Sequence, residues 1–144
     1  MSHKALHSLI GILVFFSSAA MAQDWKAEWE KMVAAAHEEG LVTVYGPPGN
    51  QYRDAITSFQ EFYPKIKLNY LPGSGTDNSQ RLLTERRADK YLADIFVAGS
   101  GTMALLAKAR VLDPLPPALI LPENKDQSLW FSKKHLYADP ENQY

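Results

Sequence analysis

The segment 66–81 has the sequence IKLNYLPGSGTDNSQR, an apolar run followed by a glycine-rich turn and a polar, helix-like stretch. The tetrapeptide inside it, Gly73-Ser74-Gly75-Thr76, occurs a second time at Gly99-Ser100-Gly101-Thr102. Each copy follows a strand-like run and precedes a helix-like run. In α/β proteins, ligands bind where the carboxyl ends of parallel strands lead into helices. The repeated tetrapeptide therefore predicts two loops of one ligand site.

Both copies place small and hydroxyl residues where a helix begins. The first N–H groups of a helix have no partner within it, and the helix macrodipole adds partial positive charge there. Glycine lets a bound group approach the backbone, and serine or threonine adds a hydroxyl donor. We therefore expect a small, anionic or oxygen-rich ligand. The predicted ligand-binding residues of the two turns are Ser74, Gly75, Thr76, Ser100, Gly101 and Thr102.

Strand-like and helix-like runs alternate along the chain around these turns. Apolar spacing and turn residues predict helices over 24–39, 52–62, 77–88 and 102–110, and strands over 41–45, 66–71 and 94–98. Asp77, with Gln80 three residues later, is the expected N-cap of the third helix, and Thr102 that of the fourth. The alternation predicts an α/β fold with a partial doubly wound parallel sheet.

The sequence after residue 112 gives weaker signals. Four prolines between 114 and 122 predict a rigid, extended segment rather than a helix. The stretch 135–138 fits one more strand. Two histidines, His37 and His135, are expected to be exposed to solvent.

Two residues beside the turns complete the candidate site. Tyr45 and Gly46 end the first predicted strand, just before Pro47, and are counted as ligand-binding residues. The position of Tyr45 fits a core side chain and a cleft-lining side chain equally well. Arg81, in the first turns of the third predicted helix, fits either an exposed ion pair or a guanidinium that contacts an anion in the cleft.

The first 22 residues have the features of a secretory signal peptide. A weakly basic start is followed by an apolar stretch over 9–16 and by Ala20-Met21-Ala22, an A-x-A cleavage site. The apolar stretch is too short to span the roughly 30 Å of hydrocarbon in a bilayer. We therefore expect a cleaved signal peptide over 1–22 and an exported domain over 23–144.

Composition and motifs exclude several classes of function. The 144-residue chain has a net charge of −1 and no cysteine, so disulfides and thiolate metal sites are excluded, and no basic patch indicates nucleic-acid binding. Gly99-x-Gly101-x-x-Ala104 fits a relaxed dinucleotide fingerprint, but the second strand with an acidic end is missing, so no cofactor is expected. The chain has no G-x-S-x-G elbow and no H-E-x-x-H helix around His37, so neither catalysis nor metal binding is expected.

Several stretches, in this order and spacing, resemble one protein family. They are Trp29-Glu30-Lys31, EGLVTVYG over 39–46, FQEFYP over 59–64, IKLNY over 66–70, RRADKYLAD over 86–94 and LDP over 112–114. Together they resemble the periplasmic substrate-binding proteins of bacterial ABC importers, in the group of extracellular solute-binding proteins that includes ferric-iron binders. The resemblance covers essentially all of 23–144.

The resemblance implies a fold, a location and a function. Members of the family have two α/β lobes, bind solute in the cleft between them by hinge closure, and deliver it to a membrane permease. The chain resembles the N-terminal part of the first lobe, so the second lobe is expected to be absent and the chain to be a fragment or a truncated product. A monomeric periplasmic protein that captures a small anion or organic acid is the expected function.

Ferric iron is a further candidate ligand that the resemblance implies. Iron-binding relatives often carry a histidine after the first strand and a glutamate near the second strand-to-helix turn, but 46–49 and 73–77 have neither in the expected place. This departure argues against direct coordination of ferric iron by these turns. A non-functional remnant of a binding protein and a periplasmic α/β enzyme domain are the alternative interpretations.

Overall fold

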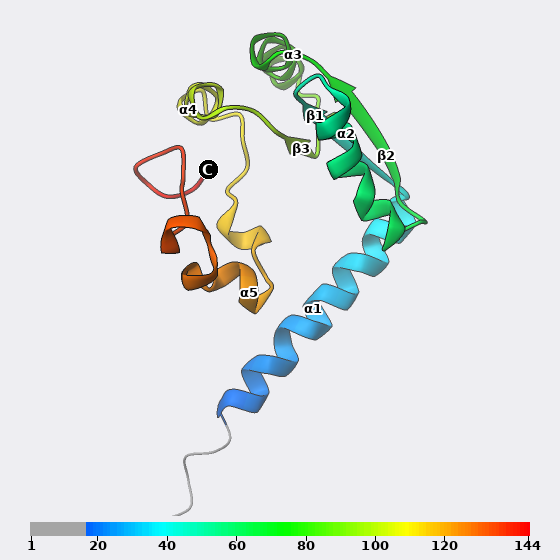
Figure 1. The fold of residues 1–144 in the computed structure, drawn as a ribbon, viewed down its shortest axis with the longest axis vertical. Helices are drawn as coiled ribbons and strands as arrows, with labels where there is room; N and C mark the ends of the chain where they lie inside the picture. The colour runs from blue at the N-terminus through cyan, green and yellow to red at the C-terminus, as the bar shows by residue number, and fades with distance from the viewer. Residues whose placement is uncertain (1–16) are drawn as a thin grey trace, which may run out of the picture.

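The computed structural model describes residues 17–144 of the chain, with side chains from Trp25 onward. A long first helix is followed by alternating strands and helices and then by short helical turns. Figure 1 shows the first helix projecting away from the sheet, on the side opposite α3. The elements are α1 (Ser17–Glu39), β1 (Leu41–Gly46), α2 (Asn50–Thr57), η1 (Ser58–Glu61), β2 (Lys67–Pro72), α3 (Gly75–Arg87), β3 (Ile95–Phe96), α4 (Ser100–Lys108), η2 (Pro116–Ala118), α5 (Pro122–Lys125), η3 (Gln127–Leu129) and η4 (Phe131–Lys133).

The three strands form a parallel sheet in the order β2-β1-β3. β1 pairs with β2 along its whole length, from Leu41 opposite Lys67 to Gly46 opposite Pro72. On its other side, β1 pairs with β3 only at Val44 and Tyr45. Because β2 and β3 flank β1, the connection through α3 passes across β1. The predicted α/β class and the parallel sheet are confirmed.

The core lies between β1 and the helices that follow β2 and β3. Val44 on β1, Leu82 on α3 and Leu106 on α4 are at most 2% exposed. Burying side chains of this size stabilises the fold by roughly 1.5–3 kcal/mol each, before the cost of ordering the chain. α3 contacts both the central strand and α4, so the burial of Leu82 and Leu106 helps to fix where the N-termini of the two helices lie.

The first helix ends where the sequence predicts. Gly40 follows Glu39 with a φ of +66°, and its N–H bonds to the carbonyl of Ala36 at 2.9 Å. Glycine tolerates this left-handed conformation, so it ends the helix and turns the chain into β1. The predicted start at residue 24 is wrong, because the helix already begins at Ser17.

The predicted signal peptide falls mainly on residues 1–16, which lie outside the described residues. Residues 17–22, with the proposed cleavage site, form the first turns of α1. Between residues 17 and 144, every helix is too short or too polar to cross a membrane.

The second predicted helix and the second predicted strand are close to their observed bounds. The helix over 52–62 is present as α2 and the 3₁₀ turn η1, which together run from Asn50 to Glu61. The strand over 66–71 is shifted by one residue, to Lys67–Pro72.

The third predicted strand, over 94–98, is much shorter than expected. Asp94 lies just before β3, and its carboxylate accepts a hydrogen bond from the N–H of Thr43 at 2.7 Å, in the place of a strand carbonyl. The N–H of Val97 still donates to the carbonyl of Tyr45 at 2.8 Å. A side-chain acceptor therefore interrupts the ladder at one end, and only Ile95 and Phe96 keep strand pairing.

The predictions for the C-terminal stretch are partly wrong. The proline-rich segment is not wholly extended, because it forms the 3₁₀ turn Pro116–Ala118 and the short helix Pro122–Lys125. The stretch 135–138 forms no strand. His135 is half-buried rather than exposed, since its ring packs edge-on against Trp130 with the ring centroids 4.9 Å apart.

Candidate functional site

The two copies of the tetrapeptide meet at one edge of the sheet. α3 begins directly after β2 and α4 shortly after β3, so both helix N-termini lie at the carboxyl ends of parallel strands. Gly75, the first residue of α3, lies so close to Thr102 that a Cβ added at Gly75 would be 2.6 Å from Thr102 Oγ1. The fold thus brings together two segments that are 26 residues apart in the sequence.

In the first copy, the hydroxyl of Ser74 caps the helix. Ser74 Oγ accepts a hydrogen bond from the N–H of Asp77 at 3.1 Å and donates one to Asp77 Oδ2 at 2.7 Å. Ser74 is therefore the N-cap of α3, and the prediction that Asp77 has this role is wrong. Ser74 outcompetes Asp77 because its side chain satisfies a backbone donor while Asp77 adds negative charge to the first turn.

In the second copy, the helix begins without a side-chain cap. Gly99 is the N-cap of α4, and its carbonyl accepts from the N–H groups of Thr102 at 3.0 Å and Met103 at 3.1 Å. Thr102 lies inside the first turn, so the prediction that it caps the helix is wrong. No atom lies within 4 Å of a Cβ built on Gly99 or on Gly101, so the backbone here is open.

The two helix N-termini differ in charge. The carboxylate of Asp77 lies in the first turn of α3, whereas the first turn of α4 has no acidic residue. Among the described residues, the first two N–H groups of each helix have no hydrogen-bond partner, those of Gly75 and Thr76 in α3 and those of Ser100 and Gly101 in α4. Because an anion is repelled by Asp77 but attracted by free N–H groups at a helix start, the α4 side is the better place for one.

Tyr45 lies in the core rather than along an open cleft. It is 2% exposed, and its hydroxyl donates to Glu85 Oε1 on α3 at 2.7 Å. Burial, and then the hydrogen bond to Glu85, raise the pKa of Tyr45 above its ordinary value. Arg81 is exposed and its guanidinium lies 5.5 Å from the centre of the Tyr45 ring, where a cation–π contact holds it. Among the described residues, Arg81 forms no ion pair.

Gly46 is buried at the end of β1 and ties the first copy to the sheet. Its carbonyl accepts from the N–H of Gly73 at 2.9 Å and from Asn78 Nδ2 at 3.2 Å. Asn78 also reaches the carbonyl of Gly73 at 3.4 Å and is 4% exposed. Sequence reasoning missed the role of Asn78 and that of Glu85. The signal available in the sequence was that Asn78 has a short amide side chain, which can hydrogen-bond to nearby backbone groups, and lies just after a glycine-rich turn.

The predicted ligand-binding residues differ in their exposure to solvent. The exposed ones are Ser74, Thr76, Ser100 and Gly101, and the hydroxyl of Ser74 is already hydrogen-bonded. Gly75 and Thr102 are half-buried, and Tyr45 and Gly46 are buried. Within residues 17–144 the structure holds no cluster of three or more His, Asp or Glu side chains suited to a metal ion.

A separate apolar hollow of about 400 Å³ lies under α2, away from these turns. Its lining includes Val42 on β1, Leu68 on β2, and Ile56 and Phe59 from α2 and η1. The hollow carries few polar groups, so it does not extend the candidate site.

No protein-family model matches the chain, and no curated protein matches it.

Proposed function

We propose that the chain captures a small anionic solute as the first lobe of a two-lobed periplasmic binding protein, for delivery to an ABC importer permease. The observation that carries the proposal is the contact between Gly75 and Thr102, which joins two helix N-termini at the carboxyl edge of one parallel sheet. The strand order 2-1-3 is that of sheets whose ligands bind at the switch point between the first and third strands.

The free donors favour an oxyanion over a bare metal ion. The N–H groups of Ser100 and Gly101 are donors, and the described residues at the two turns offer Asp77 as the one carboxylate. Ferric iron bound directly needs several anionic ligands, so a ferric ion would have to arrive as a complex with an organic acid. A phosphate or a carboxylate fits the donors directly.

The expected affinity of this chain by itself is low. A helix N-terminus contributes about 0.3–1 kcal/mol to a bound anion, and up to ~2 kcal/mol when partly buried. A dissociation constant of about 1 mM corresponds to roughly 4 kcal/mol, and about 1 μM to roughly 8 kcal/mol. Two helix ends therefore support binding at about the millimolar level at best. Tight binding requires the groups of a second lobe and the exclusion of water on closure.

A titration with site resolution tests the proposal. The chain, labelled with ¹⁵N, is titrated with inorganic phosphate while its amide signals are recorded. We expect saturable shifts at the amides of Ser100 and Gly101 and smaller shifts at Gly75 and Thr76. Saturable shifts elsewhere, with these four amides unmoved, would refute the site.

A matched pair of variants tests whether phosphate binding depends on the turn at Gly101 or is changed by added bulk anywhere in the chain. Gly101→Leu places a bulky side chain in open space beside the free N–H groups and should abolish the phosphate-induced shifts. Ala34→Leu adds similar bulk at an exposed position of α1 and should leave them unchanged. Equal phosphate binding by both variants would contradict the proposal.

A further inference from the structure

A second hollow lies at the other end of α3. It has a volume of about 450 Å³ and lies between the last turns of α3 and the segment that follows α4. Arg86, which lines the hollow, is about 16 Å along α3 from Gly75. Its lining residues are Leu83, Arg86, Arg87, Tyr91, Ala109, Arg110, Val111, Leu112 and Asp113. A hollow of this size matches the range of small-molecule sites.

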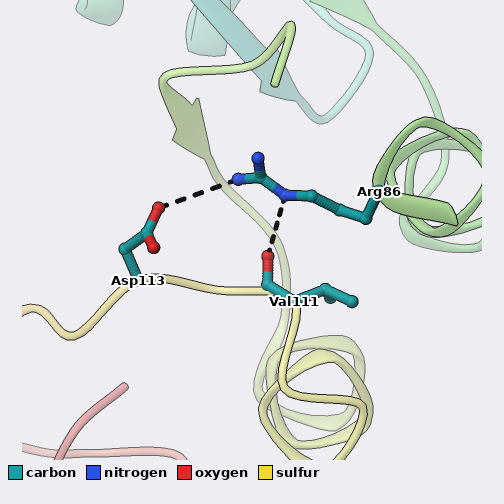
Figure 2. Close-up of polar contacts among 3 residues, drawn as sticks. All are labelled: Arg86, Val111 and Asp113. Atoms are coloured by element: carbon teal, nitrogen blue, oxygen red, sulfur yellow. Dashed lines mark hydrogen bonds and ion pairs between the residues drawn. The ribbon is translucent and has the colours of Figure 1, made fainter. Parts of the chain in front are cut away.

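Arg86 is held in place on one wall of this hollow. Figure 2 shows its side chain reaching from α3 to the segment after α4. Its Nε donates to the carbonyl of Val111 at 3.2 Å, and its Nη2 lies 3.8 Å from Asp113 Oδ2. The side chain is 14% exposed, and its Nη1 is buried with no hydrogen-bond partner. The side chain of Arg86 is therefore fixed in place, while one of its nitrogens, Nη1, still lacks a hydrogen-bond partner.

Tyr91 gives the same wall an aromatic surface. The guanidinium carbon of Arg86 lies 3.9 Å from the centre of the Tyr91 ring, close enough for stacking. The ring is nevertheless 66% exposed, so much of it faces solvent. Leu83, Val111 and Leu112 add apolar surface around the hollow. A ligand with a carbon skeleton, and not only a charge, finds contacts here.

The charge of the lining is strongly positive. Arg86, Arg87 and Arg110 face a single carboxylate, that of Asp113. Asp113 is 90% exposed, and its distance from Arg86 exceeds that of a hydrogen bond, so it is a weak and replaceable partner. Arginines near helix C-termini also stabilise the helix dipole. That role needs no aromatic wall and no hollow, and it leaves Arg86 Nη1 unpaired.

We propose that this hollow binds a small organic anion with two or more carboxylates. Arg87 and Arg110 would bind one carboxylate from the rim, and Arg86 Nη2 would exchange Asp113 for another. Guanidinium groups bind carboxylates in a bidentate manner, which suits a planar anion. The site is separate from the two tetrapeptide turns, and it does not depend on the proposed solute-capture function.

Calorimetric titration of the whole chain with citrate at low ionic strength tests this site. We expect saturable binding with a dissociation constant on the order of 1 mM or tighter. Arg87→Gln and Arg110→Gln each remove one exposed guanidinium and should weaken citrate binding about tenfold. Arg53→Gln makes the same change of charge outside the hollow, where Arg53 lies over the Tyr70 ring, and should bind citrate as the unmodified chain does.

Two further titrations distinguish this site from the tetrapeptide turns and identify the class of ligand. Gly101→Leu should leave citrate binding intact, and inorganic phosphate should bind the hollow more weakly than citrate. The site would be overturned if citrate showed no saturable binding, if the Arg87→Gln and Arg110→Gln variants bound citrate as tightly as the unmodified chain, or if Gly101→Leu lost citrate binding. Equally tight, arginine-dependent binding of phosphate would overturn the assignment to polycarboxylates.

Discussion

The same four residues, Gly-Ser-Gly-Thr, begin two helices in two different ways. In the first copy, Ser74 is the N-cap and exchanges two hydrogen bonds with Asp77. In the second copy, the helix begins one position earlier in the tetrapeptide, with Gly99 as the N-cap and no side-chain cap. The first copy has a side-chain cap and is called the closed copy, and the second has none and is called the open copy. A local sequence therefore does not determine its own helix register.

The residues after each tetrapeptide explain this difference. Asp77 and Asn78 follow the first copy and supply the partners for Ser74 and for the carbonyls of Gly46 and Gly73. Met103 and Ala104 follow the second copy and have no side-chain donor or acceptor for these roles. Because only the first copy has polar neighbours, only the first is tied to the sheet through side chains.

The largest predicted effect concerns the contact between the two copies. Gly75→Val places a branched side chain against Thr102 Oγ1, whose own side chain is stiff because it is β-branched. Overpacking of this kind costs about 1–3 kcal/mol. We expect the free energy of unfolding, measured in urea, to fall by that amount.

Two further variants test the origin of that loss. Gly101→Val is the matched substitution in the open copy and should be close to neutral, because no atom lies within 4 Å of its Cβ. Thr102→Ala in the Gly75→Val background should recover part of the stability, giving a coupling energy in a double-mutant cycle. Equal losses for Gly75→Val and Gly101→Val would contradict the close approach of the two copies.

The second prediction concerns how α3 is held to the central strand. Tyr45→Phe removes the hydroxyl that donates to Glu85 Oε1, on a carboxylate whose Oε2 is already buried without a partner. Leaving a buried acceptor unpaired costs about 1–3 kcal/mol. Urea unfolding at neutral pH should show this loss.

The pH dependence of the same variant gives an independent check. The pKa of Tyr45 is raised in the folded protein above the ordinary value of 10.0, so the unfolded chain loses this proton first. The stabilisation is therefore fully present below pH 10 and is lost as the pH rises toward the folded-state pKa. The stability difference between the unmodified chain and Tyr45→Phe should narrow above pH 10. A constant difference up to the alkaline limit of folding would show that the hydroxyl is not buried.

The third prediction compares the two serines directly. Ser74→Ala removes an N-cap and should cost about 1 kcal/mol. Ser100→Ala changes an exposed residue at the start of α4 that has no capping role and should stay within about 0.5 kcal/mol of neutral. Thermal unfolding of the two variants in parallel measures the contrast. A larger loss for Ser100→Ala would reverse the assignment of closed and open copies.

The elements of the sheet could be predicted from the sequence because their signals are local. Gly40 marks the end of α1 by a backbone conformation that glycine favours, and the apolar run over 41–45 predicts β1. The shortening of β3 could not be predicted, because it depends on the Asp94 carboxylate reaching the N–H of Thr43, 51 residues away in the sequence.

The proximity of the two tetrapeptide turns could be predicted from the sequence, but their hydrogen bonds could not. That both turns lie at one edge follows from the parallel alternation of strands and helices. Whether a side chain caps the helix depends on pairs such as Ser74 with Asp77, which the tetrapeptide alone does not specify. The arginine-lined hollow joins the end of α3 to the segment after α4, so no single stretch of sequence indicates it.

The smallest predicted effect compares alanine at the third position of each copy. Gly101→Ala should stabilise the chain by about 0.5–1 kcal/mol, because alanine favours a helix over glycine and its Cβ meets open space. Gly75→Ala gains the same helix propensity but places a Cβ 2.6 Å from Thr102 Oγ1, so its net effect should be smaller or destabilising. Thermal unfolding of both variants measures the difference. A stabilised Gly101→Ala variant with weaker phosphate binding would mean that the fold does not require glycine here and that the ligand site does. Unchanged phosphate binding would instead mean that the open backbone at Gly101 is not used by an anion.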